Sequence, residues 1–548
     1  MSKFQEGLQA EAEQDYVQAL LKFTAALESV GPQSNADQAL TWLKIANNLM
    51  RLMKWQQAAD TFAFVDQLLP SNAQVHHGLA ISYSHLGDIA KALEHAEVAT
   101  NIAPDDWRMA LTHAYILSIV KPDQATKLEI YRCWGERFAD PITAKAQSPK
   151  VTDSSLSRPL HIGYISGDMR EHSIAFFMTP VFANHDKAQV AVSVFSTSKI
   201  QDAYTAQLKS LVPDWHDVSA LDDDALFKLI RKLKIDVLVD LSGHTEGQRI
   251  FVFARRAAPI QVTWLGFMGT LGMQAMDYRL TDFGADPADN EQWYVEKLFR
   301  LNCMASYIPP ADTPLSPEPP MLENGAPTLI SLNNSKKLTD EMLLLWSRIL
   351  TQRPDATLII HVQELRTEDA VASMQPRLER LGLPLEQIII SPSVPLAEFM
   401  QRGCIADIAL DTSPISGGTT TLHALWMGLP VIALDAEDAT SSSSARTLQG
   451  LGLEQWVAAD EDAYIAKVLA LMNNPDQLTE HRATTRVNML SSALMDYPAR
   501  CAELEQAYRL MWFNYLLTEK NKTAEPRYLD VNVDIAHETI VVESLLTT

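Results

Sequence analysis

The sequence lacks the features that mark secreted, membrane and zinc-stapled proteins. Its four cysteines lie far apart and form no CxxC pair; they are Cys133, Cys303, Cys404 and Cys501. We therefore expect reduced, mostly buried thiols, no metal site and a cytoplasmic location, because disulfides persist in oxidising compartments. No run of about 18 apolar residues occurs, and the polar start MSKFQEGLQAEAEQ has no apolar core, so we expect neither a membrane span nor a signal peptide.

Basic residues are scarce relative to acidic ones. The 548-residue chain has 45 Lys and Arg against 68 Asp and Glu, a formal net charge of −23. Such a surface repels nucleic-acid phosphates, so we expect no DNA or RNA partner, although a local site for a diphosphate is compatible with it. No GxGxxG follows the first apolar strand and no GxxxxGKS/T is present, which argues against the usual nicotinamide, flavin and P-loop sites.

The N-terminal part contains an internal repeat. WQQAADTFAFVDQLLP (55–70) and DIAKALEHAEVATNIAP (88–104) align with an offset of 34 residues, and DYVQALLKFTAAL keeps the same internal spacing of small and aromatic residues. This period resembles the tetratricopeptide repeat, whose helix pairs stack into a solenoid that holds peptide or protein segments. An ordinary helical bundle is the alternative. We predict about three repeats over residues 1–120.

Beyond the repeats, the pattern changes to short apolar strands alternating with helices. A polar linker near 143–158 and the Pro-rich stretch 307–327 divide this part into two halves. Alternation of this kind predicts parallel sheets covered by helices, with ligands beyond the carboxyl ends of the strands. We therefore predict a fold of α + α/β class, an α-solenoid followed by two Rossmann-like domains. The predicted parts are 1–120 (repeats), 121–158 (helical connector and linker), 159–310 and 325–520 (Rossmann-like domains) and 521–548 (a tail of unassigned role).

The segment DTSPISGGTTTLHALWMGLPV carries the strongest local signal. A strand ends at Asp411, two glycines follow, and three threonines open a helix. Glycines allow close backbone approach, and free amides at a helix start bind anions, so a diphosphate is the natural ligand. A threonine-capped turn without a ligand is the alternative. The predicted residues are Asp411, Gly417, Gly418, Thr419, Thr420 and Thr421.

Two lysines occur at the same predicted sheet end. Lys336 and Lys337 follow the strand TLISLNN at the start of the next helix. A lysine there can neutralise a departing diphosphate, although a lone lysine near a helix start is commonly a solvated surface charge.

Several long motifs, in order, resemble the O-linked N-acetylglucosamine transferase and SPINDLY family. They are GYISGDMREHS, DLSGHTEGQRIFVFARRAAPIQVTWLGFMGT, MDYRLTD, SLNNSKKL and RGCIADIALDTSPISGGTTTLHALWMGLPV. The match covers about residues 160–480 and the repeats. The resemblance implies a GT-B-type glycosyltransferase that needs no metal or other cofactor. Its implied reaction is inverting transfer of a sugar, by default N-acetylglucosamine from UDP-N-acetylglucosamine, to Ser or Thr of a protein client.

The resemblance also implies roles for individual residues. His172 matches a histidine near the sugar and acceptor, as an orienting group or a base. Lys337, nine residues before Trp346, matches the essential lysine. Asn334 and Arg402 match positions near the phosphates and the nucleotide, and Thr419 and Thr420 match the phosphate-binding pair.

Departures from the family pattern cluster around the nucleoside. Gly418 replaces a histidine, His423 an acidic ribose contact, Phe399 a base-stacking histidine and Leu396 a lysine. We expect Phe399 and His423 to contact the nucleoside, but the changes leave GDP-fucose or a CMP-linked sugar open as donor. His244, after another strand, is a candidate to line the cleft.

Two other functions stay open at this point. A non-catalytic adaptor would bind a partner through the repeats and keep a degenerate transferase half. A transferase of small molecules or glycans would use the repeats for assembly. By analogy with bacterial proteins of this domain pairing, flagellin is a candidate client, and a homodimer is compatible with the sequence.

Overall fold

A computed structural model describes residues 2–28, 35–362 and 367–520. The chain folds into two compact units. One comprises Met1–Phe138, Met268–Gly272 and Tyr307–Asp496; the other comprises Ala139–Phe267, Met273–Ser306 and Tyr497–Thr548. The predicted tail 521–548 lies outside the described residues.

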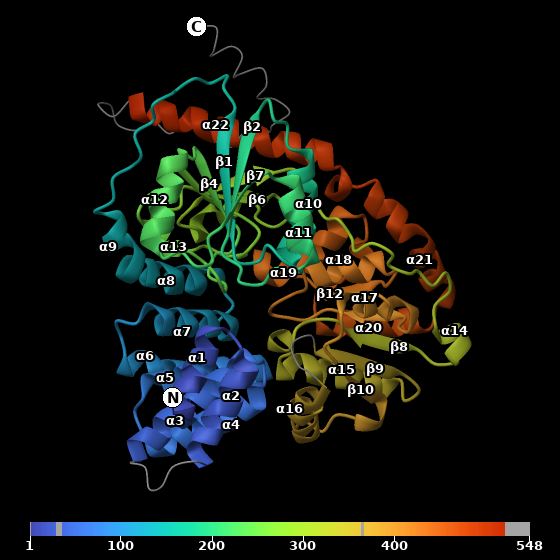
Figure 1. Cartoon of the computed structure of the whole chain (residues 1–548). Helices are drawn as coiled ribbons and strands as arrows, with labels where there is room; N and C mark the ends of the chain where they lie inside the picture. Colours follow the sequence, from blue (N-terminus) through green and yellow to red (C-terminus); the bar gives the residue numbers. More distant parts are fainter. Residues whose placement is uncertain (1, 29–34, 363–366, 521–548) are drawn as a thin grey trace. The chain divides into compact units, whose positions relative to one another are not determined.

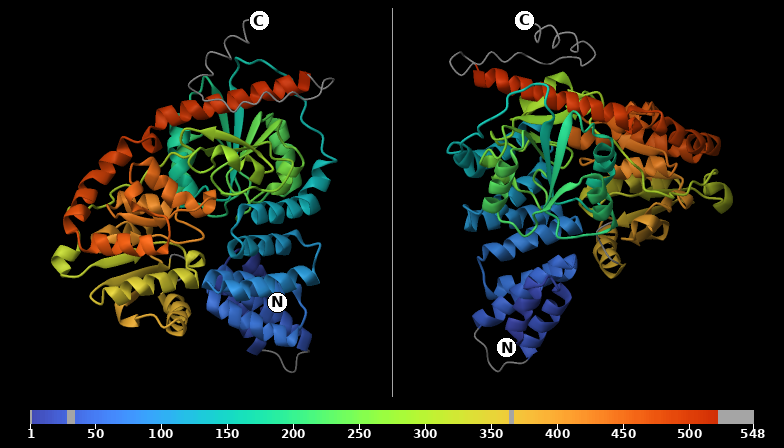
Figure 2. Two further views of the ribbon diagram at one scale, coloured as in Figure 1. Left: turned by 180° about the vertical axis from the view of Figure 1, so that it is seen from behind. Right: turned by 45° about the horizontal axis from the view of Figure 1, so that its top comes forward.

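Stacked helices make up the N-terminal part of the first unit (Figures 1 and 2). They are α1 (Lys3–Ala12), α2 (Tyr16–Glu28), α3 (Asn35–Arg51), α4 (Trp55–Leu68), α5 (Ala73–Leu86), α6 (Ile89–Ile102), α7 (Trp107–Val120) and α8 (Gln124–Trp134). Asn72 and Asp88 cap α5 and α6 by accepting hydrogen bonds from first-turn amides. A Cβ at Gly78 would lie 2.3 Å from the Phe62 ring, so a small residue is required where α4 and α5 meet. The predicted helical repeats are therefore present.

The array is longer than the predicted three repeats over residues 1–120. The described helices form four consecutive pairs, and α8, which we assigned to the connector 121–158, is the partner of α7. The aromatic cluster of the connector explains the difference. Tyr131 and Trp134 are buried, and the Trp134 indole donates to the backbone oxygen of Trp107 at 3.1 Å.

The other part of the first unit follows the Pro-rich stretch and contains a β-sheet. Its six parallel strands have the order β10-β9-β8-β11-β12-β13. They are β8 (Thr328–Ser331), β9 (Thr357–Val362), β10 (Ile388–Pro392), β11 (Ile408–Leu410), β12 (Val431–Leu434) and β13 (Val457–Ala458). The main helices are α15 (Asp340–Gln352), α16 (Thr367–Arg380), α18 (Thr419–Trp426), α19 (Ala439–Gly450), α20 (Glu461–Met472) and α21 (Pro475–Leu490).

The second unit contains a seven-stranded parallel sheet of order β3-β2-β1-β4-β5-β6-β7. Its strands are β1 (Leu160–Ser166), β2 (Val190–Ser196), β3 (Asp214–Asp217), β4 (Val237–Asp240), β5 (Ile260–Thr263), β6 (Tyr278–Asp282) and β7 (Lys297–Leu301). Helices α10 (Ser173–Asn184), α11 (Ala203–Leu211), α12 (Asp223–Leu233) and α13 (Ile250–Ala254) connect strands of this sheet. Counted along each sheet, the six-stranded sheet has the 3-2-1-4-5-6 strand order of doubly wound folds, and the seven-stranded sheet has the same order with a seventh strand added, which confirms the predicted class.

The last helix belongs to a different domain from the one we predicted. The sequence predicts residues 497–520 in the second Rossmann-like domain. In the structure, α22 (Tyr497–Lys520) instead packs on the seven-stranded sheet of β1–β7 (Figure 1). Its Tyr508 and Trp512 are buried in the same core as Tyr164 of β1. The His185 ring at the end of α10 also bonds Glu505 of α22 at 2.8 Å. Burial of this apolar face outweighs closeness in sequence to the second domain.

Among the described residues, we find no helix with both the length and the apolar character needed to cross a membrane.

Candidate functional site

A buried carboxylate shapes the glycine–threonine turn that follows β11. Asp411 is 2% exposed, and its Oδ1 accepts from the Gly417 amide at 2.7 Å and from Asn333 Nδ2 at 3.1 Å. Burial raises the pKa of Asp411, and hydrogen bonds from the Ser444 side chain and the Gly417 amide, together with the charge of Lys337, oppose that rise. We predicted Asp411 as a binding residue; in the structure one of its oxygens holds the turn closed.

The turn has a supporting part and an accessible part. Gly417 and Thr421 are buried, and a Cβ at Gly417 would lie 2.4 Å from Thr421 Oγ1, so only glycine fits there. Thr421 Oγ1 bonds Ser444 Oγ of α19 at 2.6 Å. Gly418, Thr419 and Thr420 are partly exposed. A ligand can therefore reach residues 418–420, whereas Gly417 and Thr421 hold them in place.

Backbone amides are available at this accessible part. Gly418 precedes α18, and the first helical hydrogen bonds run from the amides of Thr421 and Leu422 to its carbonyl oxygen. The amides of Gly418, Thr419 and Thr420 thus come before the hydrogen-bond ladder of the helix, where partial positive charge accumulates. The arrangement suits an anion with several oxygens.

The predicted lysine lies beside this turn. Lys337 is the last residue of a short 3-10 helix, η3 (Ser335–Lys337), after β8, and β8 is the neighbour of β11 in the sheet. Its Nζ donates to the carbonyl oxygen of Ser416 at 2.7 Å. Asn334 caps η3 by accepting from the Lys336 amide at 2.9 Å. We call Lys337 together with Gly418–Thr420 the phosphate seat.

Trp346 supports the loop of the phosphate seat indirectly, through Tyr464. Trp346 is fully buried on α15, and its indole donates to the Tyr464 hydroxyl at 3.4 Å. That hydroxyl donates to the backbone oxygen of Asp411 at 3.0 Å. Lys337 on η3 and Trp346 on α15, nine residues apart in the sequence, therefore both hold the loop that follows β11, at Ser416 and at Asp411.

The residues predicted to contact the nucleoside form one cluster. The Phe399 ring, 4% exposed, packs on His361 at 5.2 Å and on His423 at 6.0 Å between ring centroids. His423 is also buried, and its Nδ1 bonds the Tyr307 hydroxyl at 2.7 Å. Burial lowers the pKa of His423 to about 3, so the ring is neutral. Their contacts with a nucleoside stay predictions.

Arg402 and His361 extend this cluster. Arg402 lies 3.7 Å from Glu398, and its Nε is buried without a hydrogen-bond partner among the described residues. Burial, and then the charge of Arg402, lowers the pKa of His361 to about 4. Sequence reasoning missed His361; its one signal is a polar residue near the carboxyl end of the apolar strand TLIIHV.

In the second unit, His172 caps the helix that follows β1. Its Nδ1 accepts from the Ile174 amide at 3.3 Å and lies 3.8 Å from an Asp168 oxygen. Burial lowers the pKa of His172, although Asp168 opposes this. A neutral ring that accepts at Nδ1 carries its proton at Nε2. In this tautomer, Nε2–H is the hydrogen-bond donor of the His172 ring.

His244 lies in a loop that meets the loop after β1. The Ser242 and Ser166 hydroxyls are 3.3 Å apart, and a Cβ at Gly167 would lie 2.8 Å from the backbone oxygen of Glu246. The His244 ring contacts Phe267 edge to face, with centroids 5.3 Å apart. The structure thus brings His244 to the carboxyl end of the seven-stranded sheet of β1–β7, where His172 also lies.

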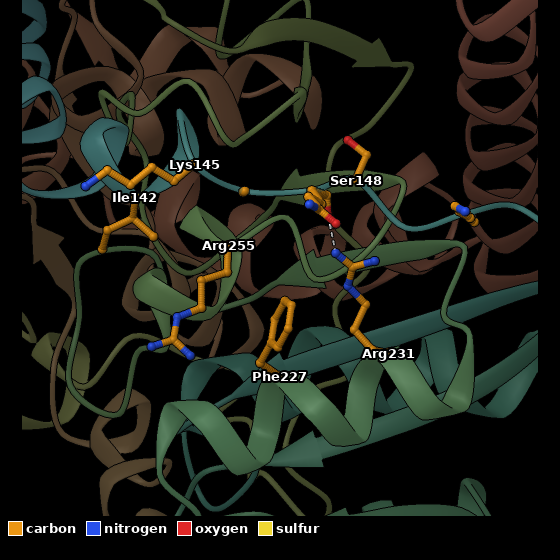
Figure 3. Close-up of a pocket in the computed structure, with 9 residues that line it drawn as sticks. Ile142, Lys145, Ser148, Phe227, Arg231 and Arg255 are labelled. Carbon is orange, nitrogen blue, oxygen red and sulfur yellow. Dashed lines mark hydrogen bonds between the residues drawn. The ribbon is translucent and has the colours of Figure 1, made fainter.

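A pocket of about 690 Å³ in the second unit involves none of the predicted residues (Figure 3). We call it the cationic pocket, because four cations and no acidic residue line it: Lys145, Lys150, Arg231 and Arg255. Figure 3 shows Phe227 between Arg255 and Arg231. Arg231 donates to the backbone oxygen of Gln147, and Arg255 pairs with Asp224 outside the pocket.

Comparisons with known proteins match most of the chain. The model of Glycosyl transferase family 41 matches residues 142–307 and 321–504. A relative from Solanum lycopersicum, named "Probable UDP-N-acetylglucosamine--peptide N-acetylglucosaminyltransferase SPINDLY", is 34% identical over 424 residues, 76% of this chain and 45% of the relative. The relative named SEC from Arabidopsis thaliana is 29% identical over 389 residues, 68% of this chain and 39% of its own length. The chain thus spans less than half the length of these relatives.

A solved structure extends the match to the whole fold. The O-GlcNAc transferase of Thermobaculum terrenum, determined as a lysine-to-methionine mutant, is 30% identical with a TM-score of 0.87. The match covers 94% of this chain and 98% of that one. The matched motifs include both loops of the phosphate seat. The chain belongs to glycosyl transferase family 41.

Proposed function

We propose that this protein transfers a sugar from a nucleotide-diphosphate donor to Ser or Thr hydroxyls of a protein. The observation that carries the proposal is the Lys337 ammonium, bonded to Ser416 O at 2.7 Å beside a turn whose glycine cannot be replaced without a clash. The names of the relatives mention UDP-N-acetylglucosamine and peptide, which supports this donor as the default.

The seat would act on the leaving group. In an inverting transfer, the acceptor oxygen bonds to the anomeric carbon as the bond to the diphosphate oxygen breaks. Negative charge then grows on the diphosphate, where the ammonium and the amides of residues 418–420 can bind it. Preorganised donors of this kind are worth about 10²–10³ in rate each. Because the seat supplies this charge itself, we propose that transfer needs no metal or other cofactor.

His172 would act on the acceptor side. With Nδ1 occupied by the Ile174 amide, its Nε2–H can hydrogen-bond the acceptor oxygen and orient it. The lowered pKa of the imidazole makes it a weak base, so we assign it orientation. The hydroxyl proton leaves to a phosphate oxygen of the leaving group or to water. His244, in the neighbouring loop, is assigned to the same side.

The helical repeats would bind the client. They form a stacked array, and such arrays recognise extended segments along their surface. Flagellin is the first client to test. The cytoplasmic location of the protein and its assembly as a homodimer stay predictions. A non-catalytic adaptor would use the array in the same way but would not transfer sugar.

A nucleotide screen and one variant pair test the proposal. Thermal shifts with UDP, GDP and CMP identify the base, and mass spectrometry of a co-expressed client detects the added sugar. Lys337→Ala should abolish transfer, and Lys336→Ala, its partly exposed neighbour, should not. Full transfer by Lys337→Ala would reject the mechanism, and binding of none of the three nucleotides would favour the adaptor.

A further inference from the structure

The helical array touches the segment that carries Lys337. The Ser335 hydroxyl of η3 donates to the carbonyl oxygen of His85 at 2.7 Å, and Ser335 is fully buried. His85 is in the last turn of α5, and its ring stacks on Trp55 of α4 with centroids 3.6 Å apart. A residue anchored by two helices of the array therefore fixes the backbone two positions before Lys337. We call residues His85–Gly87 the repeat corner.

A glycine allows the corner to approach this closely. Gly87 has a φ of +77°, and a Cβ there would lie 2.4 Å from Arg377 Nη1 and 3.2 Å from the backbone oxygen of Ser335. Arg377, itself buried, donates to the backbone oxygen of Leu338 at 2.6 Å and to Asp340 Oδ1 at 2.7 Å. The corner thus packs against groups that hold the chain on both sides of Lys337.

The array makes a second contact behind the other half of the seat. Lys127 of α8 pairs with Asp438 at 2.9 Å, with both side chains largely buried. Asp438 caps α19 by accepting from the Thr440 and Ser441 amides. Ser444 of the same helix donates to the backbone oxygen of Gly417 at 2.9 Å. Both the lysine and the glycine turn therefore rest on elements that the array holds.

We propose that the repeat corner positions Lys337, so that the helical array sets donor affinity and turnover as well as binding clients. This inference rests on the proposed function. The ammonium must reach both Ser416 O and a diphosphate, and errors of about 1 Å in such a group cost on the order of 10² in rate. Client binding that shifts the corner would change donor affinity, and donor binding would change client affinity by the same factor.

Two variants of the full chain test the contact directly. Ser335→Ala removes the hydroxyl that meets His85 O, and Ser335→Thr retains one. Gly87→Ala adds a methyl against Arg377, and Gly382→Ala is its control, because Gly382 has a similar φ of +70° with nothing within 4 Å. We expect Ser335→Ala and Gly87→Ala to weaken UDP binding at least five-fold and to lower kcat, whereas Ser335→Thr and Gly382→Ala stay within two-fold.

The kinetic pattern separates positioning from simple loss of folded protein. Displacement of Lys337 lowers kcat and raises KM for the donor, with KM for the client unchanged. A smaller folded fraction lowers kcat alone. Ser335→Ala or Gly87→Ala is not used if it lowers the melting temperature by more than about 5 °C. In that case Lys127→Gln, which removes the ion pair with Asp438, is the test. Its expected result is a two- to five-fold loss of UDP affinity. Unchanged UDP affinity and kcat in these variants would overturn the inference, and an inactive Lys337→Ala beside them would leave the proposed function intact.

Discussion

Two regions of the molecule present positive charge to a ligand, and they do so in opposite ways. The phosphate seat has one ammonium, Lys337, and the amides of residues 418–420 on a turn braced by Asp411. The cationic pocket has four cations, of which Lys145 and Lys150 are exposed. Counting charges alone would assign a diphosphate to the pocket.

Geometry and burial reverse that choice. Exposed charges are screened by water and salt, and long side chains lose conformational freedom when a ligand fixes them. The seat's groups are already held in place by a part-buried hydrogen bond at Lys337 and a buried one at Gly417, so binding costs little reorganisation. The comparison teaches that a few donors fixed in place outweigh a larger number of mobile charges. The predictions below test this ranking.

The largest expected effect is loss of the seat's single ammonium. Lys337→Gln keeps much of the side chain's length but removes the charge, so turnover should fall by about 10²–10³, or about 3–4 kcal/mol of transition-state stabilisation. Steady-state transfer assays measure this, with Lys336→Gln as the matched control. A loss below ten-fold would mean that the seat does not bind the leaving group.

Much of this site could be predicted from the sequence, because strand ends and glycines carry local signals. The rule that parallel strands end at one sheet edge brought Lys337 to the glycine turn. Sequence could not show which face of each element points into the protein. Thr421 and His423 are engaged by Ser444 and Tyr307, residues distant in sequence.

The parts that sequence reasoning misplaced also depend on distant contacts. Helix α22 follows the domain of β8–β13 in the chain, yet its apolar face is buried against the seven-stranded sheet of β1–β7. The sequence predicts α8 as a connector because the aligned 34-residue repeats end at residue 104, before α7 and α8 begin. In both cases packing of an apolar face decided the domain, and no local motif reports it.

Acid pH is expected to give the second largest effect, and it acts on the seat's domain. The pKa values of His361 and His423 are lowered from 6.5 to about 4 and about 3. Between pH 6.5 and 4 the unfolded chain therefore binds protons that the folded chain does not, so stability is full above about 6.5 and falls as pH falls. The loss is up to about 1.4 kcal/mol per histidine per pH unit.

Calorimetry at pH 7.5, 6 and 5 measures this loss. His361→Gln should show a shallower decline of melting temperature with acid than the unaltered chain, because one of the buried imidazoles is gone. Equal slopes for the two proteins would show that these rings do not control acid stability.

A methyl group at the turn should have the next largest effect. Gly417→Ala places a Cβ 2.4 Å from Thr421 Oγ1 and 2.9 Å from Asp411 Oδ1, so the turn must move. UDP affinity should fall at least about ten-fold, or about 1.4 kcal/mol. Gly418→Ala meets only Ser443 Oγ at 3.7 Å and should cost less. Equal losses for the two alanines in titration calorimetry would contradict the division into supporting and accessible residues.

The smallest expected effect concerns the cationic pocket, and it is the sharpest test of the ranking. Lys145→Gln with Arg255→Gln removes two of the pocket's charges, and neither side chain belongs to the seat. Exposed side-chain charges contribute little to binding at physiological salt, where the screening length is about 8 Å. UDP affinity should therefore change less than two-fold in 0.15 M salt, and turnover should change equally little. A ten-fold loss would place the diphosphate in the pocket and make Lys337 a structural residue, because one donor cannot depend equally on both regions.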